Sequence, residues 1–156
     1  MELDISSKRR ETEMAYRFLE GLTVADIAFE ATGKTLEELL QSAGDALLAT
    51  EVRDPKTVHR KLDKRISIES RNEEWLLHDF LQELIFYKDA ELLLFSGYDL
   101  RADRTLGGYL LEGTLRGEQL NAKKHELLSD VKAVSWHKFK VEKTKEGWRA
   151  VVILDV

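Results

Sequence analysis

Apolar and polar residues alternate with a two-residue period in several stretches of the chain, as in strands that bury one face. Two-residue hairpin turns are indicated at Gly107-Gly108, and a longer turn at Lys145-Glu146-Gly147. The alternation predicts seven strands, which cover residues 16–19, 26–31, 58–70, 92–100, 109–117, 131–141 and 148–154.

Two segments instead repeat apolar residues at the helical spacing of three and four. Thr35 begins a capping box with Glu38, and this predicts a helix over residues 36–49. Asn72 is a favourable N-cap for a second helix, predicted over residues 73–88.

The predicted order is strand, strand, helix, strand, helix and then four strands. Helices do not alternate with strands, so the pattern indicates an α+β fold: a largely antiparallel sheet with two helices packed on one face. The chain has 156 residues, a single proline at Pro55 and no linker-like segment. We therefore expect one domain over residues 14–156, preceded by a mobile polar tail over residues 1–13.

The composition excludes several functional classes. There is no cysteine, which rules out disulfides, thiolate metal sites and a cysteine nucleophile. Twenty-four basic and 29 acidic side chains leave a net charge of -5, so RNA or DNA binding over a broad surface is not expected, although a local basic patch is compatible with it. No segment approaches the ~20 apolar residues of a membrane span, and the N-terminus lacks a secretory signal. We expect a cytoplasmic protein with no membrane partner.

Few residues suggest catalysis. The four histidines show no metal-ligand spacing, His78 is expected at the surface, and no nucleophile can be matched to a base, so we expect no enzyme. In the strand at 131–141, alternation predicts a core face that includes His137, as a hydrogen-bonded histidine at the edge of the core. The same alternation predicts an opposite face made of Lys132, Val134, Trp136, Lys138 and Lys140. That face is either an ordinary solvated surface or a contact surface.

Carboxylates occur where two apolar strands begin and end. Asp26 opens one strand, and Asp155 and the α-carboxylate of Val156 follow the other. If these strands are neighbours, three like charges converge and require a cation between them. Oxygen donors alone suit Ca²⁺ or Mg²⁺. The alternative is that all three are solvated strand ends.

Several ordered segments make the chain resemble the archease family, small proteins that assist the tRNA-splicing RNA ligase. They are Tyr16-Arg17-Phe18-Leu19-Glu20, Ala25-Asp26-Ile27-Ala28-Phe29-Glu30-Ala31, Gly33, Thr35-Leu36-Glu37-Glu38-Leu39, Val131-Lys132-Ala133-Val134-Ser135-Trp136-His137, Gly147-Trp148 and Leu154-Asp155-Val156. The resemblance extends from Tyr16 to Val156.

The resemblance implies a fold with a strand-helix-strand-strand core and a cofactor protein without a reaction of its own. Such a protein promotes guanylylation and repeated turnover of the RNA ligase, and meets RNA only through it. The resemblance also implies a divalent ion, Ca²⁺ or another cation such as Mg²⁺ or Mn²⁺, held by Asp26, Asp155 and Val156. Lys132 is implied as a contact to the ligase.

The chain departs from the family pattern before Asp26. Thr23-Val24 stand where the family has His-Thr, and Gly21-Leu22 look inserted. Two other functions therefore stay open: a metal-stabilised protein-binding module with a different partner, and a metal-dependent hydrolase acting at the carboxylates, for which the chain offers no base or nucleophile.

Overall fold

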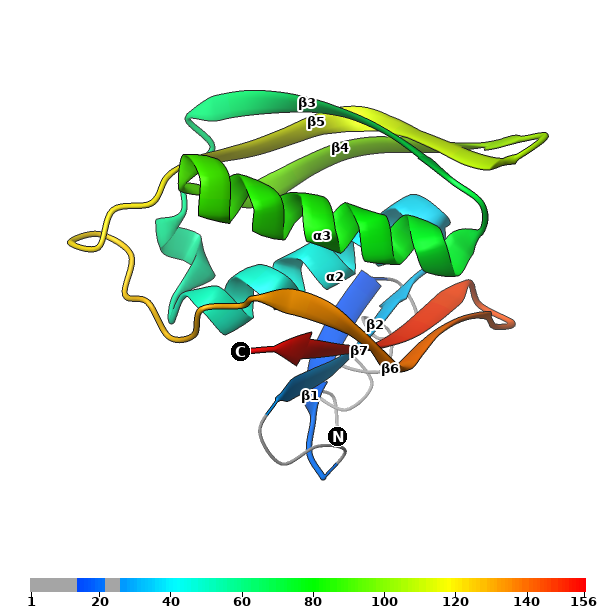
Figure 1. Ribbon diagram of the computed structural model, residues 1–156, viewed down its shortest axis with the longest axis horizontal. Helices are drawn as coiled ribbons and strands as arrows, with labels where there is room; N and C mark the ends of the chain where they lie inside the picture. Colours follow the sequence, from blue (N-terminus) through cyan, green and yellow to red (C-terminus); the bar gives the residue numbers. More distant parts are fainter. Residues whose placement is uncertain (1–13, 22–25) are drawn as a thin grey trace, which may run out of the picture.

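A computed structural model describes residues 14–21 and 26–156 (Figure 1). The expected mobile tail, residues 1–13, and residues 22–25 of the departing segment lie outside the described residues. The described elements are β1 (Met14–Leu19), β2 (Ile27–Gly33), α2 (Leu36–Glu51), the short 3-10 helix η1 (Pro55–Thr57), β3 (Leu62–Ser70), α3 (Glu73–Glu91), β4 (Leu93–Thr105), β5 (Gly108–Gln119), β6 (Ala133–Lys143) and β7 (Trp148–Asp155).

The predicted α+β class is confirmed, and the strands are divided between two sheets. One sheet has the order β1-β2-β7-β6 and the other β3-β5-β4, and all their pairings are antiparallel. The implied strand-helix-strand-strand core corresponds to β3, α3, β4 and β5. Both helices lie between the two sheets (Figure 1), which makes three layers.

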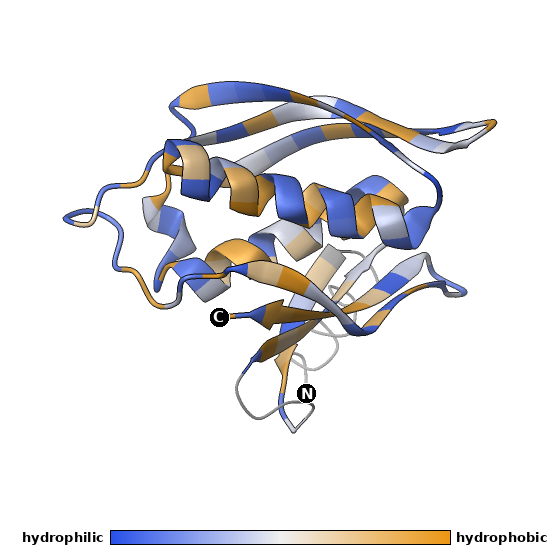
Figure 2. Ribbon diagram, in the orientation of Figure 1, coloured by the Kyte–Doolittle hydropathy of each residue, from blue (hydrophilic) through white to orange (hydrophobic). Residues whose placement is uncertain are grey.

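The helices are covered on two sides, and their sequences reflect it. Along α2 the buried positions run well beyond one stripe and include Ser42, Leu48 and Thr50. Figure 2 shows apolar residues recurring along both helices and along the strands on either side of them. A helix buried over most of its circumference needs a second layer to cover it. The predicted arrangement, a single sheet with both helices packed on one of its faces, would have left part of α2 in water.

Both predicted helix starts are confirmed. The Thr35 hydroxyl accepts a hydrogen bond from the Glu38 backbone N–H at 3.2 Å, and the Asn72 side chain accepts from the Trp75 N–H at 2.9 Å. The Glu38 carboxylate accepts from the N–H of Lys34, one residue before the cap. These bonds satisfy N–H groups that the helices leave without an internal partner.

The predicted faces of β6 are wrong for Val134 and His137, whereas Val131, Phe139 and Val141 lie toward the core as predicted, and a bulge interrupts the strand between them. Ser135 pairs with Ile153 and Lys140 with Val151, so four residues of β6 lie opposite a single residue of β7. Before the bulge Val134 is buried, whereas after it Phe139 and Val141 pack on the core. His137, expected at the core edge, is exposed within the bulge, next to Lys138 with a φ of 56°. The extra residues shift the alternation within β6: the even-numbered Val134 faces inward before the bulge, and the odd-numbered Phe139 and Val141 face inward after it.

Neither helix of the described residues has the length and apolarity needed to cross a membrane.

Candidate functional site

The predicted site residues gather at one end of the four-stranded sheet. Ile27 pairs with Leu154 across β2 and β7, so the antiparallel register puts Asp26, the preceding residue, opposite Asp155. On the other side of β7, Ala133 pairs with Asp155, and the Lys132 N–H donates to the Asp155 carbonyl at 2.8 Å. Strand pairing therefore brings Asp26, Asp155, Val156 and Lys132 to the same edge.

This edge is accessible to a ligand. Asp26 and Asp155 are half-buried, and Lys132 and Val156 are exposed. Among the described residues, no three histidine, aspartate or glutamate side chains lie close enough to share a metal ion. The side-chain carboxylates that meet at this edge are those of Asp26 and Asp155. Such an oxygen-only donor set fits Ca²⁺, Mg²⁺ or Mn²⁺.

A buried lysine fixes the segment that carries Lys132. The ammonium of Lys88, on α3, donates to the Val131 carbonyl at 2.9 Å and to the Asp130 carboxylate at 2.6 Å. Burial alone would lower the pKa of Lys88, but the Asp130 hydrogen bond and the charge of Glu51 outweigh it and raise the pKa above its usual value. Lys88 is therefore charged at neutral pH and ties α3 to the entry of β6.

Glu51, next to this lysine, is itself almost fully buried. Burial raises the pKa of Glu51 to about 7, although Lys88 acts in the opposite direction. One of its carboxylate oxygens lies 3.6 Å from the Lys88 ammonium, and that oxygen has no hydrogen-bond partner in the described part of the chain. Lys88 therefore holds this segment mainly through Asp130 and the Val131 carbonyl, and we call these two contacts the Lys88 clamp.

The face of β6 that was predicted as a solvated or contact surface carries an aromatic cluster. Trp136 stacks on the imidazole of His78 with ring centroids 4.0 Å apart, and Trp75 and Phe139 contact its indole ring. His78 was expected to be an ordinary surface histidine. It is half-buried instead, and its Nε2 donates to the Val134 carbonyl at 3.1 Å.

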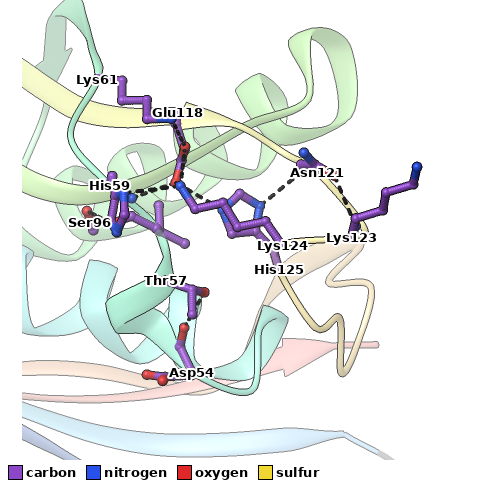
Figure 3. Close-up of polar contacts among 11 residues, drawn as sticks. Asp54, Thr57, His59, Lys61, Ser96, Glu118, Asn121, Lys123, Lys124 and His125 are labelled. Carbon is purple, nitrogen blue, oxygen red and sulfur yellow. Dashed lines mark hydrogen bonds and ion pairs between the residues drawn. The ribbon is translucent and has the colours of Figure 1, made fainter.

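A second polar cluster, in the connection from β5 to β6, was not found from the sequence (Figure 3). The Glu118 carboxylate accepts hydrogen bonds from the His59 backbone N–H at 2.6 Å, from the Lys124 ammonium at 2.8 Å and from the His125 imidazole at 3.0 Å. Burial raises the pKa of Glu118, but these hydrogen bonds outweigh it and hold the pKa at about 2. The cluster links η1, β5 and the connection that follows.

This second cluster is structural. The His125 ring is 0% exposed, its Nε2 faces Glu118, and its Nδ1 accepts the Asn121 N–H at 3.0 Å. Both ring nitrogens are therefore occupied and out of reach of a substrate. Among residues 14–21 and 26–156, no serine or threonine hydroxyl is hydrogen-bonded to a histidine ring. Glu118, Lys124 and His125 are close in the sequence but form no known motif, and the contact to His59 joins segments 59 residues apart.

The fold and these side chains define a small three-layer α+β protein whose candidate site is an exposed sheet edge. A sequence model of the Archease protein family (MTH1598/TM1083) matches residues 16–156. Protein archease from Pyrococcus furiosus is 34% identical over 133 residues, which covers 85% of this chain and 93% of that protein. Protein archease from Thermococcus kodakarensis is 36% identical over the same length.

Solved structures agree. The solution structure of Methanobacterium thermoautotrophicum protein 1598 has a TM-score of 0.79 and 33% identity, and covers 91% of this chain and 99% of that chain. A Thermotoga maritima structure described as an archease and possible chaperone has a TM-score of 0.55 at 21% identity, and this likeness concerns the fold alone. The chain belongs to the archease family.

The Glu118 cluster predicts a pH-dependent contribution to stability. Glu118→Gln should lower the free energy of unfolding near pH 7 by about 2 kcal/mol, because buried hydrogen bonds to a charged group are lost. A carboxylate with a depressed folded pKa stabilises above its unfolded pKa, 4.5, and loses that effect as pH falls through about 2.

Urea unfolding of the wild type and of Glu118→Gln between pH 2 and 7 measures this dependence. The difference in the free energy of unfolding between the wild type and Glu118→Gln should become steadily smaller below about pH 4.5. Glu112→Gln, an exposed change on the same strand, serves as the control and should stay within ~0.5 kcal/mol of the wild type. A gap that does not depend on pH would show that Glu118 is not held as a carboxylate.

Proposed function

We propose that this protein is a non-catalytic protein cofactor of the tRNA-splicing RNA ligase, acting in the cytoplasm. In this role it promotes guanylylation of the ligase and repeated turnover. Membership of the archease family supports the proposal. The observation that carries it is the meeting of Asp26, Asp155 and Lys132 at one sheet edge, because these positions match those that the family resemblance implies for metal binding and ligase contact.

In this proposal the metal and the lysine have different roles. Asp26 and Asp155, with the α-carboxylate at Val156, hold a divalent cation such as Ca²⁺, which neutralises their mutual repulsion and joins the ends of β2 and β7. Lys132 presents a point charge suited to phosphate in the ligase active site. The Lys88 clamp and the bond to Asp155 hold the Lys132 backbone in place.

A second candidate is a metal-stabilised binding module with a different partner. It is favoured by the departure at residues 21–24, where Thr23-Val24 replace the His-Thr of the family pattern. A changed segment beside Asp26 would alter what this edge contacts, while Asp26 and Asp155 themselves are retained. Both candidate functions include metal binding, but only the first predicts that this protein raises the activity of the ligase.

The ligase assay separates them. With GTP and a divalent metal, substoichiometric amounts of this protein should allow the cognate ligase to join RNA ends over many turnovers. The measurements are product per ligase molecule over time and the fraction of guanylylated ligase. A product yield that stays at one per ligase, with or without this protein, would contradict the proposed function and favour the second candidate.

Lys132→Ala tests the contact to the ligase. Lys132 is exposed and its backbone bond survives the change, so the free energy of unfolding should move by no more than ~0.5 kcal/mol. Ligase turnover should nevertheless fall about tenfold or more, because a charge aimed at phosphate is lost. Lys145→Ala, in the exposed β6–β7 turn, is the control and should activate the ligase like the wild type. Full activation by Lys132→Ala would remove this residue from the contact.

The metal is tested without any ligase. Asp26→Asn and Asp155→Asn each remove one charge at nearly constant shape, and a C-terminal tag converts the Val156 carboxylate to an amide. Each change should weaken Ca²⁺ binding roughly tenfold or more, because affinity for hard cations follows ligand charge and number. Each should also reduce the rise in melting temperature that Ca²⁺ produces.

Calorimetric Ca²⁺ titration and melts with and without chelator measure both effects. Asp63→Asn, an exposed carboxylate of the other sheet, and an N-terminal tag of equal size are the controls and should bind Ca²⁺ normally. Tight binding by the C-terminally tagged protein would exclude Val156 as a ligand. Normal binding by both Asn variants would show that Asp26 and Asp155 are solvated strand ends.

A further inference from the structure

The bulge of β6 builds an exposed aromatic surface against α3. We call it the aromatic shelf and define it as Trp75, His78, Trp136 and Phe139. The Trp136 and His78 rings are nearly parallel, with an interplanar angle of 7° and centroids 4.0 Å apart. Trp136 nevertheless remains 45% exposed. A large ring exposed to this extent requires an explanation, because burying it would be favourable.

Only one face of the Trp136 indole is covered within the shelf. The Trp75 centroid lies 4.7 Å from that of Trp136 and 6.2 Å from that of His78. Together with the 4.0 Å between Trp136 and His78, these distances define a triangle of ring centroids with nearly a right angle at Trp136. Trp75 therefore lies beside the edge of the Trp136 indole and does not stack on its face. Phe139, at 5.0 Å and 63°, also lies beside it. None of the other three rings of the shelf stacks on the indole face opposite His78, and Trp136 is 45% exposed, so we take that face as the place for a further planar ring.

The shelf is held rigidly. His78 donates to the Val134 carbonyl at 3.1 Å, and the Gln82 side chain accepts the Val134 N–H at 2.6 Å. β6 is an edge strand of its sheet, and these two α3 side chains occupy backbone groups that another strand would otherwise use. Because the backbone groups of Val134 are occupied, a ligand here would contact the ring of Trp136 and would not pair with β6 as an additional strand. A preorganised ring loses little entropy when a ligand binds.

One cationic group lies over a ring of the shelf, and a second is close to the shelf in the chain. The Arg71 guanidinium is 4.5 Å from the Trp75 ring centroid, and Lys138 lies within the bulge, two residues after Trp136. Among the described residues neither forms an ion pair with a carboxylate, so both charges are available to an anion. The opposing charges in the first half of α3 are Glu73 and the exposed Glu74 in its first turn, and Asp79 next to His78. Arg71 and Lys138 are thus two cations without an ion pair in the described part of a chain of net charge -5, with acidic residues close to them in the sequence.

We propose that the aromatic shelf binds single-stranded RNA directly. One base stacks on the free face of Trp136 and extends the existing His78–Trp136 stack, and the neighbouring phosphates contact Arg71 and Lys138. Bases stack on aromatic side chains with little regard to sequence, and cations beside the rings follow the phosphate backbone. This goes beyond the proposed function, in which RNA is met through the ligase, and it does not depend on that function.

The alternative occupant is a protein partner, since tryptophan and arginine also dominate protein interfaces. Two features favour RNA. The free indole face continues a parallel stack, which suits a flat base better than an aliphatic side chain. In addition, Arg71 lies over the Trp75 ring and Lys138 follows Trp136 by two residues, and neither forms an ion pair among the described residues, which suits a chain of phosphates. A protein partner is a separate outcome of the experiment.

The experiment uses the full chain without ligase and measures fluorescence anisotropy of labelled probes at low salt. The probes are a ten-nucleotide oligoadenylate, an abasic oligonucleotide of the same length, a duplex RNA and an acidic peptide. Oligoadenylate should bind about tenfold or more tightly than the abasic and duplex probes, because only it offers bases free to stack. With about two phosphate contacts, the slope of log affinity against log salt should be roughly -1.4.

Variants separate stacking from charge. Trp136→Ala should weaken oligoadenylate binding about tenfold or more, whereas Trp136→Phe, which keeps a ring, should weaken it only a few-fold. Lys138→Ala should make the salt slope shallower by roughly 0.7, and Glu74→Gln should tighten binding. Phe86→Ala removes another exposed aromatic residue of α3 and should change nothing. If Trp136→Ala loses its fold in thermal melts, Trp136→Phe and the two charge variants decide the matter.

Three results would overturn the proposal. Equal affinity for abasic and oligoadenylate probes would mean that no base stacks on Trp136. The absence of binding to any RNA at low salt would exclude the site. Binding of the acidic peptide, lost in Trp136→Ala while oligoadenylate does not bind, would assign the shelf to a protein partner.

Discussion

The position of β7 between β2 and β6 is the constraint on which the candidate site depends. Its antiparallel pairing with β2 brings Asp26 opposite Asp155, and its pairing with β6 brings Lys132 to the Asp155 carbonyl. The same strand supplies Val152 and Leu154 to the main core. A shift of register by one residue would turn these side chains to the face of Ile153 and remove them from the main core. The free energy that buries the core therefore also fixes the geometry of the sheet edge.

Signals local to a few residues could be predicted from the sequence, and long-range pairings could not. Thr35 and Asn72 mark their helix starts because a cap needs only a side chain and the next turn. The division into two sheets is a matter of which strands become neighbours, and alternation does not contain that information. The meeting of Asp26 and Asp155 was accordingly conditional on their strands being adjacent, a condition that the register meets.

The errors have the same origin. The alternation rule failed in β6 because a bulge inserts residues after Ser135 and because α3, through His78 and Gln82, binds the backbone of Val134, and neither feature is written in the strand's own pattern. Glu118 was not singled out, and it lies just beyond the strand predicted over residues 109–117. Lys124 and His125 are close to it in the chain, but neither alternation nor a known motif marks such a group, and the His59 N–H comes from a distant segment.

Along β6 the two surfaces are close enough to act on one assembly. Lys132, just before β6, and Trp136, at the start of its bulge, are four residues apart, which is at most about 14 Å for an extended chain. The Lys88 clamp holds the strand at its entry, and the bonds of Val134 to α3 hold it between the two residues. Neither surface can move far without the other. A partner that contacts Lys132 therefore has an aromatic shelf at a fixed distance, and RNA leaving that partner could lie across Trp136.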